Sequence, residues 1–218
     1  MSKSETESYK AKEPRAETIG DAIAALRRGD VIVFPTETLY GLGADALNPV
    51  AVRKIFQLKG RDPDNPIPML VADRKMLDSL VAEVSPLTEK LIARFWPGPL
   101  TIVLPARRNF PGQLMNSTGG VGVRISSHPI ATELVRMLGR PLTATSANPT
   151  GKPAARTVEE AISYFAGAVE IFVDGGELTS KTGSTVIEIC GKEIKMIREG
   201  EITRAELNAT IGENKILC

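Results

Sequence analysis

The chain has 218 residues, of which 42% are hydrophobic and 24% are charged, proportions typical of a globular protein that can bury a sizeable core. Its formal net charge of +1 excludes a global electric field that would attract nucleic acid or a membrane, so an anion would have to be bound by locally converging cations. Two cysteines are too few for a disulfide framework, and no apolar run approaches the roughly 20 residues of a membrane span. Segment 1–15 is polar, unlike a secretory signal. We therefore expect a cytoplasmic protein.

Predicted helices and strands alternate along the first two thirds of the chain. Apolar residues at helical spacing, often preceded by a capping residue, predict helices over 17–28, 49–58, from 73, from 85 and over 130–138. Short apolar runs predict strands over 31–34, 67–71, 100–104, 121–125, 142–144 and 171–173. Gly29 and Gly60 suit the position that follows a helix.

The last third of the chain predicts a hairpin and two capped helices. Residues 184–189 and 194–198 flank a four-residue turn and predict two antiparallel strands. Thr157 with Glu160, and Thr203 with Glu206, have the spacing of a capping box.

Strands separated by helices, without repeats or a long linker, predict one α/β domain with a mixed sheet covered by helices. We expect a flexible segment over 1–15, the domain over 16–207 and a C-terminal tail over 208–218.

Polar side chains and glycines gather beside several predicted strands. Three such clusters are Thr36 to Thr38, Thr145 to Lys152 and Lys181 to Thr185. Each alone is typical of a capped loop, but three together predict one polar pocket of the kind that α/β proteins build at strand ends. Lys59 and Arg61, at the end of the helix 49–58, would supply charge for an anion; alternatively they are surface cations at a helix C-terminus. In either case we expect them outside the core.

Two nucleotide-binding motifs are excluded by their spacing. Gly41 to Ala46 matches G-x-G-x-x-A, but the helix signal begins only at Asn48, whereas a dinucleotide fingerprint starts its helix on the glycines. We therefore interpret Gly41 and Gly43 as turn residues. The chain also contains no P-loop sequence.

Single polar residues raise further alternatives. Arg124 lies inside an apolar strand and Arg198 at the end of another; each needs a structural carboxylate or an anionic ligand as its partner. Glu37 would bind Mg²⁺ or, as we slightly favour, cap a backbone. His128, before Pro129, is interpreted as structural, and Trp96 to Pro99 as a packed turn.

Four ordered motifs resemble those of the YrdC-like proteins, the threonylcarbamoyl-AMP synthases of tRNA modification. The motifs are Pro35 to Gly43, Lys59-Gly60-Arg61, Ser146-Ala147-Asn148 with Gly151, and Ser184-Thr185-Val186. The similarity runs from about Ala16 to Arg204. It implies an open, twisted α/β sheet around a basic cavity, and a nucleotidyltransferase that condenses L-threonine, bicarbonate and ATP into L-threonylcarbamoyl-AMP and pyrophosphate.

The resemblance also implies roles for nine residues. Thr38, Arg124 and Ser184 would bind threonine, with Arg124 on its carboxylate. ATP would be bound by Lys59, Arg61, Asn65, Ser146, Asn148 and Arg198. Lys59 and Arg61 would face the triphosphate and be catalytic, together with Mg²⁺ brought by ATP, and no tightly bound organic cofactor or covalent nucleophile is expected. The metal ligands are left open.

The partners that the resemblance implies are the substrates and a downstream enzyme that transfers the threonylcarbamoyl group to tRNA. Weak direct contact with tRNA is left open, and no membrane is involved. Many relatives carry a histidine where this chain has Leu70, which puts one threonine contact in doubt. Longer relatives have a C-terminal domain over the nucleotide, whereas this chain resembles the short form, in which segment 1–15 covers the nucleotide or the site stays open.

Two other functions compete with this prediction. One is a related enzyme of hydrogenase maturation that adenylates carbamoyl phosphate, which is much longer and has zinc-binding cysteines. The other is an RNA-binding or ribosome-assembly module that uses the basic cavity, for which the net charge of +1 predicts weak binding at physiological salt.

Overall fold

The computed structural model describes residues 18–62, 65–108, 110, 112–212 and 216–217, so the predicted flexible segment 1–15 lies outside the described residues. Helix α1 (Ile19–Arg28) begins at Thr18, whose side chain forms a capping box with Asp21, and ends at Gly29 with φ +84°. Helix α2 (Pro49–Lys59) begins at the cap Asn48 and ends at Gly60, as the sequence predicts.

A small sheet of four strands lies beside α1, in the order β7-β2-β1-β8. Its strands are β1 (Ile32–Phe34), β2 (Gly41–Gly43), β7 (Thr145–Ser146) and β8 (Ile171–Phe172). The interpretation of Gly41 and Gly43 as turn residues is wrong, since both lie in a buried strand that pairs antiparallel with β1. A Cβ atom at Gly43 would lie 2.7 Å from the Phe34 ring, so close packing, not a turn, requires glycine there.

A larger sheet has seven strands in the order β11-β10-β9-β4-β5-β3-β6. They are β3 (Met69–Leu70), β4 (Leu100–Pro105), β5 (Gly120–Arg124), β6 (Leu142–Thr143), β9 (Thr185–Cys190), β10 (Glu193–Arg198) and β11 (Ile216–Leu217). The α/β class with mixed pairing and the predicted hairpin β9–β10 are confirmed. The strands form two sheets, however, where the sequence predicts one.

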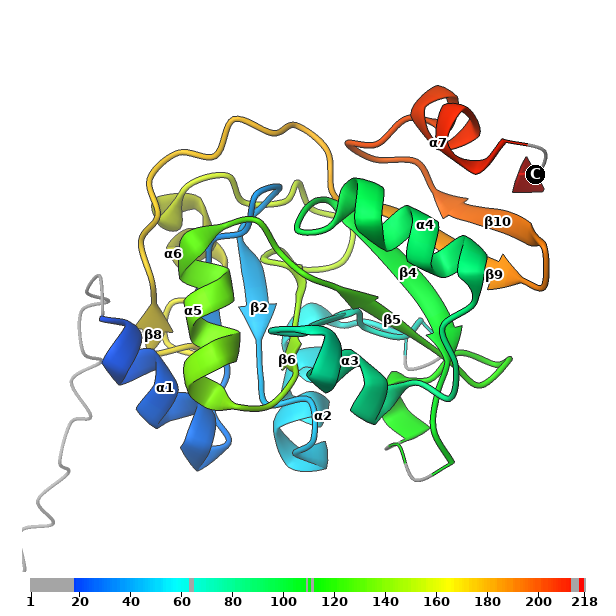
Figure 1. Ribbon diagram of the computed structural model, residues 1–218. Coiled ribbons are helices and arrows are strands. Elements are labelled where there is room, and N and C mark those ends of the chain that lie inside the picture. The colour runs from blue at the N-terminus through cyan, green and yellow to red at the C-terminus, as the bar shows by residue number, and fades with distance from the viewer. Residues whose placement is uncertain (1–17, 63–64, 109, 111, 213–215, 218) are drawn as a thin grey trace, which may run out of the picture.

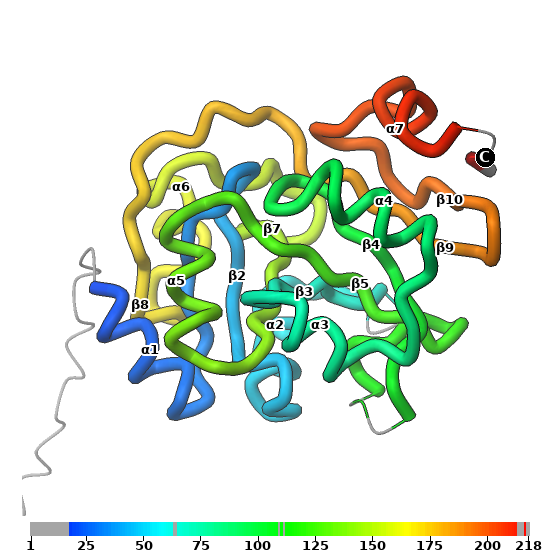
Figure 2. Tube along the Cα trace, viewed as in Figure 1, coloured from blue at the N-terminus to red at the C-terminus, as the bar shows by residue number. Residues whose placement is uncertain are grey.

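The two sheets join where the chain passes between them. The Thr143 amide donates to the Ala44 carbonyl at 2.9 Å, and the Ala44 amide donates to the Thr143 hydroxyl at 2.8 Å. Strand β3 is shorter than the predicted segment 67–71 and begins after Pro68, which has no N–H to donate to a sheet ladder. The segment between Val173 and Ser184 also connects the sheets, from β8 to β9 (Figure 2).

Helices cover the faces of the sheets that do not line the cavity. They are α3 (Arg74–Leu80), α4 (Pro86–Phe95), α5 (Pro129–Leu138), α6 (Val158–Phe165) and the 3-10 turn η1 (Gly112–Leu114). Helices α1 and α5 lie side by side (Figure 1), and their apolar residues pack with the small sheet around Phe34. Ile102 and Val123 of the large sheet pack in the main core with residues of α3 and α4, so the opposite face of β4 and β5 is left for other groups.

The two predicted capping boxes differ. Thr203 and Glu206 form the complete box at the start of α7 (Arg204–Ile211). Thr157 accepts from the Glu160 amide, but the Glu160 carboxylate accepts from the Arg156 amide at 2.7 Å, so the second half of that box is missing. Helix α7 packs on α4 and buries Leu207 and Ile211, and it thus continues past residue 207, where the sequence places the start of a tail.

None of the helices in the described residues has the length and apolar composition that crossing a membrane requires.

Candidate active site

A cavity of about 720 Å³ lies between the two sheets and brings together most of the predicted site residues. Eight of the nine line it: Thr38, Arg61, Asn65, Arg124, Ser146, Asn148, Ser184 and Arg198. They come from loops and strands far apart in the chain, which supports the interpretation of the polar clusters as walls of one pocket. The volume is in the range of small-molecule sites.

The floor of the cavity is one face of the large sheet. Residues two apart on a strand share a face, so Thr101 and Val103 of β4, and Gly122 and Arg124 of β5, all line the cavity. Two cross-strand rows continue this face onto the hairpin, because Thr101 pairs with Val186 and then Arg198, and Val103 pairs with Glu188 and then Lys195. The regular pairing of strands therefore sets the position of each floor residue.

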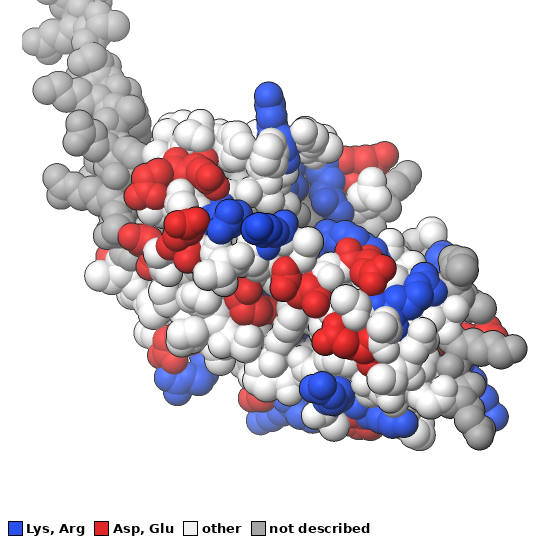
Figure 3. All heavy atoms as spheres, turned by 90° about the horizontal axis from the view of Figure 1, so that it is seen from above, with Lys and Arg blue, Asp and Glu red and all other residues white. Residues whose placement is uncertain are grey.

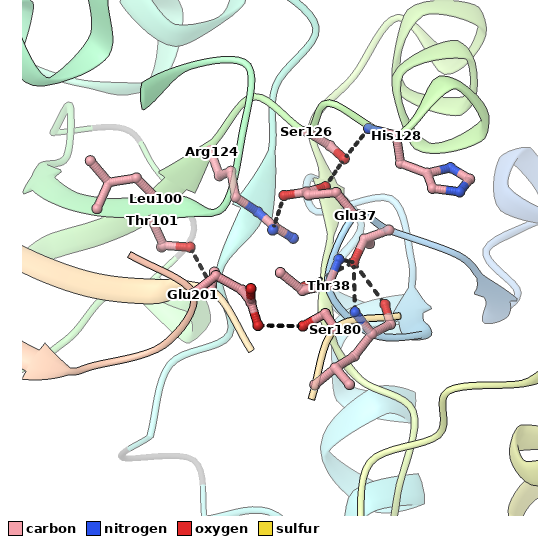
Figure 4. A network of polar contacts seen from close by, with 12 residues as sticks. Glu37, Thr38, Leu100, Thr101, Arg124, Ser126, His128, Ser180 and Glu201 are labelled. Atoms are coloured by element: carbon pink, nitrogen blue, oxygen red, sulfur yellow. Dashed lines mark hydrogen bonds and ion pairs between the residues drawn. The ribbon is translucent and has the colours of Figure 1, made fainter. Parts of the chain in front are cut away.

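Arg124 is buried and forms an ion pair with Glu37. Figure 4 shows Arg124 and Ser126 pointing toward the Glu37 carboxylate, which accepts a hydrogen bond from each. The preference for Glu37 as a backbone cap is wrong, since its partners are these two side chains. Burial lowers the pKa of Arg124, and Glu37 opposes that effect.

Thr36 shapes the loop that carries Glu37. Its hydroxyl donates to the Leu39 carbonyl at 2.7 Å and accepts from the amides of Thr38 and Leu39 at 3.2 Å. The Thr38 hydroxyl, 3.1 Å from that of Thr36, is thereby held at the cavity wall. Burial of Thr36 and Thr38 follows from this turn, which side-chain hydrogen bonding to the backbone stabilises.

Arg198 is the second cation of the floor. Its guanidinium donates to the Ser184 carbonyl at 2.8 and 3.2 Å and approaches the Ser184 hydroxyl at 3.3 Å. That hydroxyl lies 2.9 Å from the hydroxyl of Thr101. Burial lowers the pKa of Arg198, and so do the nearby charges of Arg124 and Arg61. The three guanidinium groups therefore converge on one region of the cavity.

Arg61 lies after α2 and is held by its own loop. Its side chain donates to the carbonyls of Asn65 and Pro66 at 2.7 and 3.2 Å, and burial lowers its pKa. The expectation that Arg61 stands outside the core is compatible with this half-buried position at the cavity wall.

Lys59 differs from the sequence-based expectation, because its side chain is buried rather than outside the core. Its ammonium group donates to the carbonyls of Ser146 and Asn148 at 2.5 and 2.8 Å, and to Asn148 Oδ1 at 3.2 Å. Burial, with a smaller effect of the Arg61 charge, lowers the pKa of Lys59 to about 8. Lys59 is not among the residues that line the cavity; it holds the Ser146 to Asn148 segment from behind.

Asn148 is likewise engaged within the protein. Its side-chain oxygen accepts from Lys59, and its nitrogen donates to the Lys152 carbonyl at 2.5 Å. Strand β7 positions Ser146 opposite Gly41, so the hydroxyl of Ser146 stands at the edge of the small sheet beside the cavity.

Other predicted features lie around the cavity. His128 occupies the N-cap position of α5, but its side chain caps no amide of that helix, and its buried Nδ1 has no hydrogen-bond partner among the described residues. Its amide donates to Ser126 Oγ at 3.1 Å and its imidazole points away from Glu37 (Figure 4), and a structural role for the ring stays a prediction. Trp96 donates to the Leu100 carbonyl at 2.6 Å, which confirms a packed turn. Leu70, where many relatives are expected to carry a histidine, is buried in the apolar cluster with Phe34.

The sequence reasoning missed several residues of the site. Thr101, Asn116 and Glu188 line the cavity, and Ser126 supports Glu37. A signal for Glu188 exists in the sequence, because Ser184, Val186 and Glu188 alternate along a predicted strand and therefore share a face. Ser126 and Asn116 lie in loops, whose placement no periodic pattern gives.

The described residues do not suggest a resident metal ion. They contain no group of three or more His, Cys, Asp or Glu side chains placed to hold one. Glu37, which the sequence offers as a magnesium ligand, is engaged by Arg124 and Ser126.

Comparison with known proteins shows similarity over most of the chain. A family model for Sua5, YciO and YrdC proteins, described as telomere recombination, matches residues 24–200. The chain is 40% identical over 195 residues to a threonylcarbamoyl-AMP synthase of Pyrococcus abyssi, covering 89% of this chain and 57% of that protein. It is 32% identical over 209 residues to a putative threonylcarbamoyl-AMP synthase of Mycobacterium tuberculosis, covering 95% and 96% of the two chains.

Solved structures show the same architecture. A crystal structure of P. abyssi Sua5 complexed with L-threonine matches with a TM-score of 0.87 and 39% identity, over 91% of this chain and 58% of that one. A full-length HypF structure matches with a TM-score of 0.73 at 19% identity, over 84% of this chain and 29% of that one, which shows a shared fold alone. The chain thus spans somewhat more than half the length of the P. abyssi proteins that it matches.

Proposed function

This chain belongs to the Sua5/YciO/YrdC family, and from that membership we propose that it is a threonylcarbamoyl-AMP synthase. The proposed reaction condenses L-threonine, bicarbonate and ATP into L-threonylcarbamoyl-AMP and pyrophosphate in the cytoplasm. A downstream enzyme would transfer the threonylcarbamoyl group to tRNA. Relatives that are named for this activity, and a related structure that contains L-threonine, support the proposal.

The observation that carries the proposal is the convergence of three arginines on one cavity, where Glu37 is the carboxylate that pairs with one of them among the described residues. Arg61, Arg124 and Arg198 line the cavity, and the charges of the first two lower the pKa of Arg198. Glu37 neutralises Arg124 alone. Arg124 is buried, and Arg61 and Arg198 are more exposed at the cavity wall. Guanidinium groups that converge in this way suit carboxylates and phosphates.

In this proposal the two substrates occupy different parts of the cavity. Arg124 would bind the threonine carboxylate through the N–H groups that Glu37 leaves available, and Thr38 and Ser184 would bind its amine and hydroxyl. Arg61 and Arg198 would bind the triphosphate, together with Asn65, Ser146 and Asn148.

Lys59 would act by holding the Ser146 to Asn148 loop in place. Its three donor protons face three acceptors of that loop, so we assign it a positioning role rather than a contact with phosphate.

The chemistry would need positioning and charge neutralisation rather than a covalent intermediate. The threonine nitrogen attacks the carbon of CO₂, or of bicarbonate with loss of water, and forms a carbamate. A carbamate oxygen then attacks the α-phosphorus in line, and pyrophosphate leaves with the electrons of the broken P–O bond. Mg²⁺ bound to ATP would neutralise part of the phosphate charge, and Arg61 and Arg198 would stabilise the transition state.

A pyrophosphate-release assay tests the function. We expect release from ATP only when L-threonine and bicarbonate are both present. ATP consumption that is independent of both would disprove the proposal, and carbamoyl phosphate in place of threonine would reveal the chemistry of the hydrogenase-maturation relative.

An RNA-binding role is the less favoured alternative. Acidic and basic side chains are interspersed on the face shown in Figure 3, with no broad surface of positive charge. A salt-dependent tRNA titration is expected to give weak binding, whereas tight binding that weakens steeply with salt would favour the RNA-binding module.

A further inference from the structure

The cavity extends beyond the arginines along the face of the large sheet. Glu188 lines this farther part, on the cross-strand row formed by Val103, Glu188 and Lys195. The neighbouring row contains Val186 of β9 and its partner Arg198 of β10. Val186 precedes Glu188 by two residues, which corresponds to about 7 Å along the strand. The Arg198 guanidinium lies against Ser184, four residues before Glu188, which corresponds to roughly 13 Å along a strand. The carboxylate thus stands in the same cavity as this cation but away from it.

The Glu188 carboxylate is held in a fixed orientation through one of its oxygens. Oε1 accepts from Asn116 Nδ2 at 3.1 Å and lies 2.8 Å from the Thr118 hydroxyl. Asn116 is itself fixed, because its side-chain oxygen accepts from the Gly120 amide at 2.6 Å and from the Thr118 amide at 3.1 Å. The loop before β5 thus serves as a rigid support for this carboxylate.

The second oxygen of Glu188 is available to a ligand. Within the described residues no hydrogen-bond donor reaches Oε2, and Lys195, its cross-strand neighbour, forms no ion pair with it. An oriented carboxylate with an unused acceptor, on the wall of a cavity, suits a ligand that presents a hydroxyl or amine donor.

Two glycines lie in the floor next to Glu188. Gly120 and Gly122 of β5 line the same part of the cavity and project no side chain into it. A Cβ atom at Gly120 would lie 2.7 Å from a Val103 methyl carbon and 3.1 Å from Asn116 Oδ1, so close packing against these side chains requires glycine there.

We propose that Glu188 recognises the ribose hydroxyls of the nucleotide and sets the preference of the enzyme for ribonucleotides. A carboxylate that accepts from a ribose hydroxyl is a known mode of nucleotide recognition, and Glu188 lines the same cavity as the arginines that would bind the triphosphate. This inference rests on the proposed function, because it assumes that the triphosphate lies at Arg61 and Arg198.

The variant Glu188→Gln tests the proposal, since its amide oxygen can still accept from Asn116 and Thr118 while its amide nitrogen replaces Oε2. The experiment measures kcat/KM for pyrophosphate release with ATP, 2′-deoxy-ATP and 3′-deoxy-ATP. One of the two deoxynucleotides lacks the hydroxyl that would donate to Glu188. We expect the unaltered protein to favour ATP over that deoxynucleotide by about tenfold, the effect of one hydrogen bond to a charged group. Glu188→Gln should lower the value for ATP by a similar factor and leave that deoxynucleotide unchanged.

Glu193→Gln is the matched control. It makes the same change of charge on the same hairpin, at a residue that does not line the cavity, and should keep the nucleotide preference of the unaltered protein. Three results would overturn the inference. In Glu188→Gln, kcat/KM falls equally with all three nucleotides; the unaltered protein shows no preference among the nucleotides; or Glu193→Gln changes the nucleotide preference as Glu188→Gln does.

Calorimetric binding of the same nucleotides separates the two proposals. If ATP binds with the expected preference but no threonine-dependent pyrophosphate appears, the proposed function fails and the inference about Glu188 stands. If pyrophosphate is released without any preference for the ribose, the function stands and the inference fails.

Discussion

The two sides of the cavity bury positive charge in opposite ways. On the side of the small sheet, Lys59 is surrounded by two carbonyls and an amide oxygen, which together match its three donor protons. On the floor formed by the large sheet, Arg124 uses one nitrogen for Glu37, and Arg198 contacts Ser184 alone, within the described residues. Among the described residues, both floor arginines keep N–H groups for which no protein acceptor is found.

This difference separates a cation that supports the fold from one that is prepared for a ligand. Burial is similar for Lys59 and Arg124, so burial alone does not distinguish the two roles. The number of donors left unsatisfied does, because an unsatisfied buried donor costs free energy that a bound anion recovers. Four experiments test this distinction.

The largest effect is expected for Arg124→Ala. The change leaves the Glu37 carboxylate largely buried with Ser126 as its remaining partner, and should lower the free energy of unfolding by about 3–5 kcal/mol. Urea denaturation measures the loss. In the double variant Arg124→Leu with Glu37→Leu most of the stability should return, whereas threonine-dependent pyrophosphate release should not. A loss under about 1 kcal/mol in the single variant would contradict the buried pair.

Lys59→Met is expected to have the next largest effect. It leaves the carbonyls of Ser146 and Asn148 without their donor, and should cost about 2–3 kcal/mol in urea denaturation. Lys54→Met is the control, because this lysine lies on the same helix but is 44% exposed and should cost less than about 1 kcal/mol. Equal stability of the two variants would show that Lys59 does not support the fold.

Arg198→Ala should affect activity far more than stability. Water in the cavity can replace its bonds to Ser184, so the free energy of unfolding should change by less than about 1 kcal/mol. Loss of a charged contact with phosphate should raise the KM for ATP by about tenfold to a hundredfold. Steady-state kinetics test this, and a rise in the KM for threonine instead of ATP would reverse the assignment of Arg198.

The smallest effect is a pH dependence of stability that comes from Lys59. Its pKa is lowered from 10.5 to about 8 by burial, so between these values the unfolded chain binds more protons than the folded one. The contribution of Lys59 to stability should therefore increase as pH rises through this window. Denaturation at several pH values from about 8 to 9.5 should show a slope that Lys59→Met removes. Tyr40, whose pKa is raised to about 12, would lower stability only above its ordinary value of 10.

Local signals in the sequence predicted most of the elements. Capping residues and C-terminal glycines gave the bounds of α1 and α2, and apolar runs gave β1, β4, β5 and the β9–β10 hairpin. These signals are local because capping and periodicity depend on residues a few positions apart. The clustering of polar residues beside strands also predicted that Thr38, Ser146 and Ser184 share one pocket, which the cavity brings together.

The tertiary structure decided what each residue contacts. The partner of Arg124, the enclosure of Lys59 and the packing of Gly43 against Phe34 all depend on groups distant in the chain, about which spacing carries no information. The division into two sheets depends likewise on which strand edges meet. Local sequence patterns thus account for the elements and the kinds of side chain in the cavity, whereas the fold sets which of its cations keep donors for a ligand.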